Sequence, residues 1–66
     1  KAPSKLTARE TEILKWSAMG KTASEIAAIL CLSERTVGFH ISSTFKKLGV
    51  HNKIQAVLRA AKAGLF

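Results

Sequence analysis

The sequence predicts an all-α fold built from four short helices. Four segments each begin with Ser, Thr or Asn, the residues that most often cap the start of a helix. Within each segment the apolar residues recur three or four positions apart, which is the spacing of one buried helix face. No segment alternates apolar and polar residues, and the sequence has no two-residue hairpin signal. The 66 residues, 47% of them hydrophobic, suffice for one small domain.

The first predicted helix begins at Thr7. Glu10 follows three positions later, and the two can form a capping box, in which each side chain accepts a hydrogen bond from the other residue's backbone N–H. Gly20 supplies a left-handed stop. The apolar residues expected to contact the core are Ile13, Leu14 and Trp16.

The second predicted helix repeats this capping box at Thr22 and Glu25. It must end near Cys31 and Leu32, because Ser33 has the features of the next cap. Its apolar residues are Ile26, Ala27, Ile29 and Leu30.

The third predicted helix runs from Glu34 to about Leu48 and is closed by Gly49. Its core-facing stripe consists of Val37, Ile41, Phe45 and Leu48. The second helix is short, and about three residues connect it to the third, which is the geometry of a helix-turn-helix. In that motif the second member of the pair lies in a DNA major groove.

The fourth predicted helix begins at Asn52, with Gln55 in the box position, and runs to about Ala63, with Gly64 after it. One apolar stripe is expected to face the core, and it consists of Ile54, Leu58, Ala61 and Leu65. A second stripe of small residues is expected to let a partner helix approach closely, and it consists of Ala56, Ala60 and Ala63. Helix propensity is the alternative explanation for these alanines. We expect a homodimer through the small stripe.

The chain is strongly basic, and its charge is uneven. It carries 11 Lys and Arg against 4 Asp and Glu, a formal net charge of +7. Residues 1–34 hold all four acids and have a net charge of +1, whereas residues 35–66 hold six basic residues and no acid. This asymmetry indicates a polyanion or a membrane surface as partner, and a merely solvated surface is the plainer alternative.

Composition also argues against several other features. The longest apolar runs are only a few residues, far short of the roughly 20 that a membrane-spanning helix needs. The single cysteine, Cys31, cannot form an internal disulfide. No CxxC pair or His cluster indicates a metal site, so we expect neither metal nor cofactor in this fragment.

The outward face of the third helix is the candidate DNA-reading surface. With the apolar stripe on the core, Gly38, Phe39 and Ser42 face outward, with Ser43 at the margin. A side chain over a base edge must hydrogen-bond or make apolar contact. The two Ser hydroxyls can do the first, Phe39 can do the second against a thymine methyl, and Gly38 lets the helix backbone approach closely.

For two of these residues, a structural role within the fold is an alternative to a role in reading DNA. Phe39 would belong to the core if the helix were slightly rotated. Gly38 costs about 1 kcal/mol relative to Ala in a helix interior, so either packing or close approach must account for it.

Phosphate contacts are expected near helix ends, where free amides and the positive end of the helix dipole attract anions. Lys46 and Lys47 have an alternative role, which is to complement the dipole at the end of the third helix. The candidate phosphate-contacting residues are Lys21, Thr22, Ser33, Arg35, Thr36, Lys46, Lys47 and Lys53.

A series of short motifs along the chain is similar to a known family. In order, the motifs are Thr7-Ala8-Arg9-Glu10, Gly20-Lys21-Thr22, Glu25-Ile26-Ala27, Ser33-Glu34-Arg35-Thr36-Val37, His40, Lys47-Leu48-Gly49-Val50 and Gly64-Leu65. In this combination they resemble the LuxR-type helix-turn-helix domain over about residues 6–66. Trp16, the Gly20 to Thr22 step and Phe39-His40 are more similar to the acyl-homoserine-lactone-responsive, quorum-sensing branch than to the phospho-receiver branch.

The resemblance implies the C-terminal DNA-binding domain of a cytoplasmic bacterial transcription regulator. In such proteins the third helix enters the major groove, the fourth commonly pairs with its two-fold mate, and RNA polymerase is a further possible partner. Residues 1–5 would then be the end of a linker from an absent N-terminal domain that senses a small-molecule signal.

The sequence departs from the family pattern at three positions. Gly38 and Ser42 stand where relatives often carry longer polar or basic side chains, so direct base readout is expected to be thin and DNA shape to matter more. Cys31 stands in the turn where relatives frequently have Gly, and there it would bear left-handed strain of about 1 kcal/mol.

Other classes of function fit the sequence less well. Capping accounts for the carboxylates of Glu10 and Glu25, Cys31 has no evident activating partner, and no glycine loop cradles phosphate, so an enzyme is not expected. A membrane-active helix would need one continuous amphipathic segment, whereas caps and glycines divide this chain into four. A promoter-reading domain of a sigma factor has similar second and third helices but would not explain the capped fourth helix. A helix-turn-helix domain that binds a protein partner instead of DNA remains as an alternative.

Overall fold

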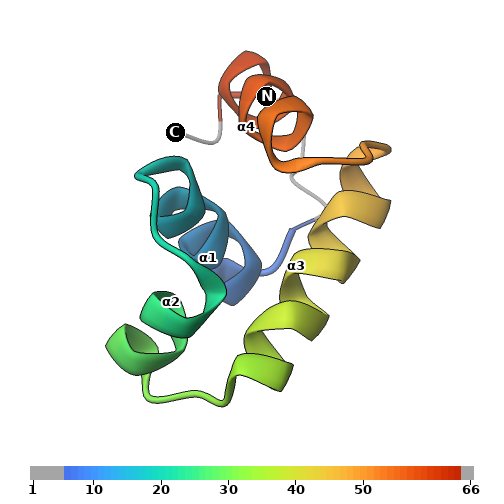
Figure 1. The fold of residues 1–66 in the computed structure, drawn as a ribbon. Helices are drawn as coiled ribbons and strands as arrows, with labels where there is room; N and C mark the ends of the chain where they lie inside the picture. Colours follow the sequence, from blue (N-terminus) through green and yellow to red (C-terminus); the bar gives the residue numbers. More distant parts are fainter. Residues whose placement is uncertain (1–5, 65–66) are drawn as a thin grey trace.

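The computed structural model describes residues 6–64, and within them every regular element is a helix. The helices, labelled in Figure 1, are α1 (Ala8–Ala18), α2 (Ala23–Leu30), α3 (Glu34–Leu48) and α4 (Lys53–Lys62). The all-α prediction is confirmed. The proposed linker at residues 1–5, and Leu65 of the predicted α4 core stripe, lie outside the described residues.

The first two helices begin at complete capping boxes. In α1, Glu10 N donates to Thr7 Oγ1 over 3.1 Å, and Thr7 N donates back to Glu10 Oε1 over 2.9 Å. Thr22 and Glu25 repeat this geometry at the start of α2, with distances of 3.2 and 2.8 Å. Both predicted boxes are confirmed, and they satisfy backbone donors that a helix start would otherwise leave free.

In the last two helices the N-cap side chain accepts its hydrogen bond, but the reciprocal half of a capping box is not formed. Thr36 N donates to Ser33 Oγ over 3.0 Å at the start of α3, and Gln55 N donates to Asn52 Oδ1 over 2.9 Å at the start of α4. The Gln55 amide oxygen accepts from His51 N rather than from Asn52 N, so the predicted box of α4 is displaced by one residue.

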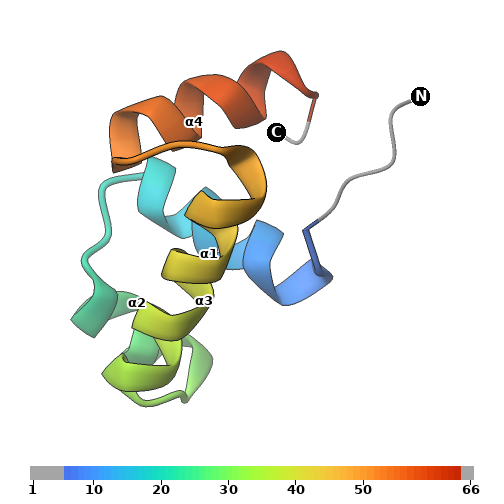
Figure 2. The ribbon, with the colours of Figure 1, turned by 90° about the vertical axis from the view of Figure 1, so that its right-hand side faces the viewer.

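The core consists of two clusters, and α1 contributes to both. Ile13 packs in the first cluster, together with Ile26, Ala27 and Val37. Leu14 packs in the second, together with Val50, Ala56 and Ala60. Among the described residues α1 contacts each of the other helices, whereas α2 and α4 do not touch. Figures 1 and 2 show α2 and α4 on opposite sides of the α1 and α3 pair.

The predicted orientation of α4 is wrong. Ala56 and Ala60 are completely buried, whereas Ile54 and Leu58 are 73% and 61% exposed and Ala61 is exposed. The small residues face inward because α4 packs against Leu14 of α1, where a helix with short side chains can lie close. The stripe of Ala56, Ala60 and Ala63 is therefore not a dimer interface, since its first two members belong to the core and Ala63 follows the helix end.

The turn between α2 and α3 contains the left-handed residue that the sequence predicts. Cys31 has φ 59° and ψ 42°, and it is exposed. Cys31 N and Leu32 N both donate to Ala27 O, which closes the end of α2. A residue with a Cβ is strained in this conformation.

We expect Cys31→Gly to raise the unfolding free energy by about 1 kcal/mol, because glycine adopts positive φ without strain. For a domain of this size that corresponds to a rise in Tm of about 4 to 8 °C, measurable by circular dichroism. Cys31→Ala is the matched control, since it removes the thiol and keeps the Cβ. An equal rise in Tm for Cys31→Ala would show that the thiol, and not the backbone angle, is the cause.

Candidate nucleic-acid interface

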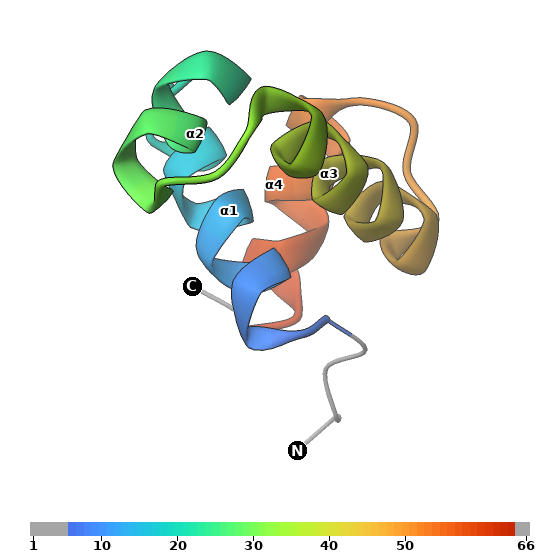
Figure 3. The ribbon, with the colours of Figure 1, turned by 90° about the horizontal axis from the view of Figure 1, so that it is seen from below.

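Helices α2 and α3, joined by a tight turn, form a helix-turn-helix unit on one side of α1. Figure 3 shows α3 beside α1 at the outside of the bundle. On the inner face of α3, Val37 and Thr44 are buried. Around them Ile41, Phe45 and Leu48 are partly buried. Thr44, which the sequence analysis did not place in the core, stands two turns after Val37, and its hydroxyl donates to His40 O over 2.8 Å.

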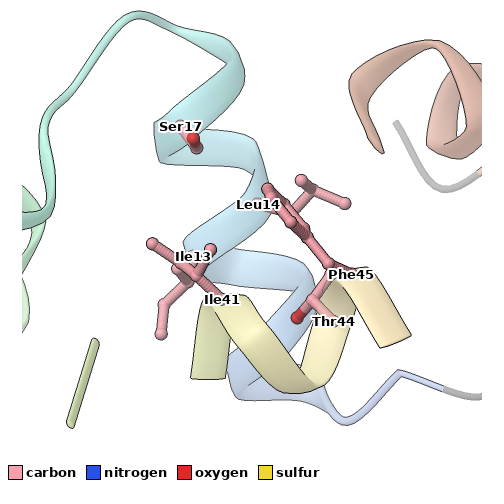
Figure 4. Close-up of a pocket in the computed structure, with 6 residues that line it drawn as sticks. All are labelled: Ile13, Leu14, Ser17, Ile41, Thr44 and Phe45. Carbon is pink, nitrogen blue, oxygen red and sulfur yellow. The ribbon is translucent and has the colours of Figure 1, made fainter. Parts of the chain in front are cut away.

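The gap between α1 and α3 is a packing feature and not a ligand site. Its lining consists of Ile13, Leu14, Ser17, Ile41, Thr44 and Phe45, shown in Figure 4. The cavity measures about 10 Å³, which is about the room that one water molecule needs. No group of three His, Cys, Asp or Glu residues comes together as a metal site within residues 6–64. None of the helices described there is long and apolar enough to cross a membrane.

The outer face of α3 carries two basic residues with an aromatic ring between them along the chain. Arg35, Phe39, Ser42 and Lys46 are all exposed on this face. Phe39 is 73% exposed, so the alternative that it belongs to the core is wrong. Its ring makes an edge contact with His40, with ring centroids 6.2 Å apart. No acidic residue occurs in the sequence from Arg35 onward.

Gly38 lies on the same helix, and the fold does not require a glycine there. A Cβ at this position would meet no atom within 4 Å beyond its own helix backbone and chain neighbours. The other three glycines have positive φ values and therefore a backbone reason, which Gly38 lacks. The packing alternative for Gly38 is thus wrong.

The start of α3 presents polar groups to solvent. Ser33 Oγ accepts from Thr36 N and donates to Thr36 Oγ1 over 2.9 Å. Arg35, in the first turn, is exposed. Free amides and the helix dipole at this end make it attractive to an anion.

At the start of α2 the polar groups already have hydrogen-bond partners in the chain. Thr22 is exposed, and both its backbone N–H and its hydroxyl interact with Glu25. The backbone hydrogen bond from Thr22, with the charge of Lys21 adding to it, lowers the pKa of the Glu25 carboxyl. Thr22 therefore acts first as a cap, and Lys21 is the cationic group at this end.

Two predicted site residues also interact with a carboxylate at the start of α1. Lys47 Nζ lies 2.8 Å from Glu10 Oε1, and Glu10 is only 3% exposed. The Ser43 hydroxyl also helps to lower the pKa of the same carboxylate. The assignment of Lys47 to phosphate and of Ser43 to bases stays a prediction, because an ion pair inside the chain occupies Lys47 without burying it.

The buried carboxylate is held in its charged form. Burial raises the pKa of Glu10, but hydrogen bonds from Lys47, the Thr7 backbone and Ser43 outweigh burial and lower this pKa from its ordinary 4.5 to about 2. The pair joins residues 37 positions apart in the chain. It fixes the last turns of α3 to the first turn of α1.

Sequence reasoning also missed a polar contact at the other end of α3. Arg59 Nη1 of α4 donates to Leu48 O over 3.1 Å, so it satisfies one of the carbonyls that a helix end leaves free. No local sequence motif predicts a contact between Arg59 and Leu48. Lys53, a predicted phosphate contact, is exposed at the first position of α4.

The fold and the basic outer face of α3 define a helix-turn-helix domain of the DNA-binding class. The family model named GerE, described as bacterial regulatory proteins of the luxR family, matches residues 4–60. The chain belongs to this family of transcription regulators.

Individual transcription regulators are also similar to this chain in sequence. The chain is 53% identical over 61 residues to the transcriptional activator protein AnoR of Acinetobacter nosocomialis, covering 92% of this chain and 26% of AnoR. It is 52% identical over 62 residues to the quorum sensing-dependent regulator RpaR of Rhodopseudomonas palustris, covering 94% and 26%. The chain thus spans about a quarter of the length of these relatives.

Solved structures share the fold. The transcription factor GerE has a TM-score of 0.89 at 40% identity, with 96% of this chain and 94% of GerE covered. The response regulator ChrA of a heme-sensing two-component system has a TM-score of 0.90 at 38% identity, covering 100% and 33%. A Vibrio cholera VqmA–ligand–DNA complex has a TM-score of 0.84 at 32% identity, covering 98% and 28%.

Proposed function

We propose that the chain binds duplex DNA sequence-specifically, with α3 in the major groove, as part of a bacterial transcription regulator. The observation that supports this most directly is the outer face of α3, where Arg35, Phe39, Ser42 and Lys46 are exposed together. An α-helix fits the major groove, where base edges present hydrogen-bonding groups and thymine methyls. The domain acts by binding and not by catalysis, and it needs no cofactor for this.

Phosphate contacts on both sides of the groove would fix the position of α3. The start of α3 offers amides and hydroxyl groups, and cations extend from the half-buried Lys21 at the start of α2 to the exposed Lys53 at the start of α4. We assign these contacts to Lys21, Ser33, Arg35, Thr36, Lys46 and Lys53, with Thr22 beside Lys21. Gly38, Phe39 and Ser42 would then face the bases.

Dimerisation is proposed through the outer face of α4. Ile54, Leu58 and Ala61 lie at positions i, i+4 and i+7, so they form one exposed apolar stripe opposite the buried alanines. Two copies packed by this stripe around a two-fold axis would present two α3 helices to half-sites about one helical turn apart.

The parent protein is proposed to be a quorum-sensing regulator of the bacterial cytoplasm and nucleoid. The relatives with 52 to 53% identity include an activator and a quorum sensing-dependent regulator. A small-molecule signal would act through an N-terminal domain, and the regulator would recruit or block RNA polymerase. The effector domain of a two-component response regulator is the alternative, which the likeness to ChrA at 38% identity favours.

Binding to a random duplex pool across a salt series, with selection of the bound sequences, tests the proposal. We expect a steep fall in affinity with salt and an enriched two-fold motif. A steep slope without enrichment would mean a phosphate binder without specificity. Absence of binding at low salt would overturn the proposal and favour a helix-turn-helix that binds a protein partner.

Arg35→Ala and Lys46→Ala should each weaken binding to every duplex and leave sequence preference unchanged. Each lost phosphate contact should reduce the slope of log K against log salt by about 0.9. Lys15→Ala is the matched control, because Lys15 is exposed on α1. If Arg35→Ala binds DNA as Lys15→Ala does, the placement of α3 on the duplex is wrong.

A further inference from the structure

Gly38 is a residue of α3 whose identity the fold leaves unexplained. A glycine in a helix interior is less favourable than alanine, because it loses more backbone freedom on folding. An alanine Cβ would enter open space at this position, and the backbone there is helical. Packing and backbone conformation within residues 6–64 thus give no reason for a glycine at this position, and close approach of a partner is the remaining one.

The neighbouring residue shows a second feature that the fold does not use. Phe39 exposes 73% of its surface on the outer face of α3. Its only ring contact within residues 6–64 is the edge of His40. A large apolar ring that is exposed on a DNA-facing helix is suited to an apolar contact with the partner.

The centre of the outer face therefore lacks long hydrogen-bonding side chains. Gly38 has no side chain, Phe39 is apolar, and Ser42 carries a short hydroxyl. Longer cationic side chains stand only one turn earlier and one turn later, at Arg35 and Lys46. Bidentate recognition of guanine or adenine needs Arg, Lys, Asn or Gln, and none of these lies at positions 38, 39 or 42.

The one apolar group that bases present in the major groove is the C5-methyl of thymine. We infer that α3 selects thymine at one base pair of each half-site by this methyl group, which contacts the Phe39 ring because the missing side chain of Gly38 lets the helix lie close. This inference rests on the proposed binding of duplex DNA. Gly38 and Phe39 act here as specificity-determining residues.

Base analogues test the contact without altering base pairing. In the selected duplex, each thymine is replaced in turn by deoxyuridine, which lacks only the methyl group. We expect one position per half-site at which affinity falls about fourfold, the value for losing one buried methyl group. Cytosine at that position should bind weakly, and 5-methylcytosine should recover part of the loss.

Protein variants test which residues make the contact. Gly38→Ala should raise the Tm by about 4 to 8 °C, since it removes the cost of a helical glycine. It should nevertheless weaken binding to the thymine duplex, because the added Cβ holds the helix further from the bases and loosens the contact between Phe39 and the methyl group. The loss on the deoxyuridine duplex should be smaller, since that duplex has no methyl contact to lose. Phe39→Ala should keep the fold and lose the distinction between thymine and deoxyuridine. Ser42→Ala, on the same face, should keep that distinction.

The outcomes separate this inference from the proposed function. If no duplex binds, the proposed function fails. If a specific motif binds but no thymine responds to deoxyuridine, the methyl contact is wrong while DNA binding stands. If Gly38→Lys binds the same motif more tightly, the helix does not lie close at Gly38, and the inference is overturned.

Discussion

Glu10→Gln should lower the unfolding free energy of the chain by about 3 kcal/mol at neutral pH, the largest stability effect that we expect from a single conservative change. The variant keeps an oxygen that can accept from Thr7 N, so the cap of α1 is retained. It leaves the Lys47 ammonium without its carboxylate at a distance of 2.8 Å. The expected loss follows from a pKa of about 2 in the fold against an ordinary 4.5.

The same variant should change how stability depends on pH. Because the pKa of Glu10 is lowered in the folded state, its contribution is complete above pH 4.5 and is lost as the pH falls toward 2. The difference between wild type and Glu10→Gln should therefore shrink over this range. Urea unfolding at several pH values, followed by the fluorescence of Trp16, measures it, since Trp16 packs against the first cluster.

Glu25→Gln provides the matched control. Glu25 occupies the same position in the capping box of α2, but it is exposed and its partner Thr22 is exposed. This variant should change stability little, since water screens the charge. Equal losses for the two variants would show that the carboxylate charge at a helix start, and not the buried ion pair with Lys47, carries the effect.

Leu58→Asp should abolish dimer formation and reduce affinity for a two-fold DNA site by at least about 100-fold. The side chain is 61% exposed in the middle of the α4 stripe, so the fold tolerates a polar group there. In a dimer the same position would be buried, and an unpaired charge in an interface is strongly unfavourable. Loss of the partner removes the second half-site contact, and with it the gain from binding both half-sites together.

Sedimentation and binding to a single half-site separate the two steps of this prediction. The variant should sediment as a monomer and bind one half-site about as well as wild type does. Gln55→Glu is the control, because it adds the same charge on α4 outside the stripe and keeps the acceptor for His51 N. If Leu58→Asp still protects both half-sites, dimerisation does not use this face of α4.

The elements with local signals could be predicted from the sequence. Thr7, Thr22 and Ser33 fix helix starts through hydrogen bonds within three residues, and Gly49 fixes the end of α3 by its left-handed conformation. The inner and outer faces of α3 were also predictable, since its apolar residues form one stripe. The helix-turn-helix and its outward residues follow from these signals.

The orientation of α4 could not be predicted in the same way. The helix has apolar residues on two sides, and hydrophobicity alone places Leu58 inside and Ala60 outside. The helix against which α4 packs decides which side of α4 is buried, because the surface of α1 at Leu14 admits a closely packed helix with small residues. The contact between Lys47 and Glu10 was equally hidden, since the two are 37 positions apart and Lys47 has the appearance of a cation at a helix end.

The division of the core into two clusters has an evolutionary consequence. Ile26 and Val37 in the first cluster support the α2 and α3 pair, whereas Ala56 and Ala60 in the second seat α4. Helix α4 also packs against Phe45 and Leu48 near the end of α3, but it does not touch α2. In the proposed dimer, a substitution that tilts α4 would therefore adjust the distance between two copies without directly moving α2 or the start of α3. If the proposed dimer through α4 forms, half-site spacing and half-site sequence are set by different helices, and a lineage of such regulators would be able to change one without the other.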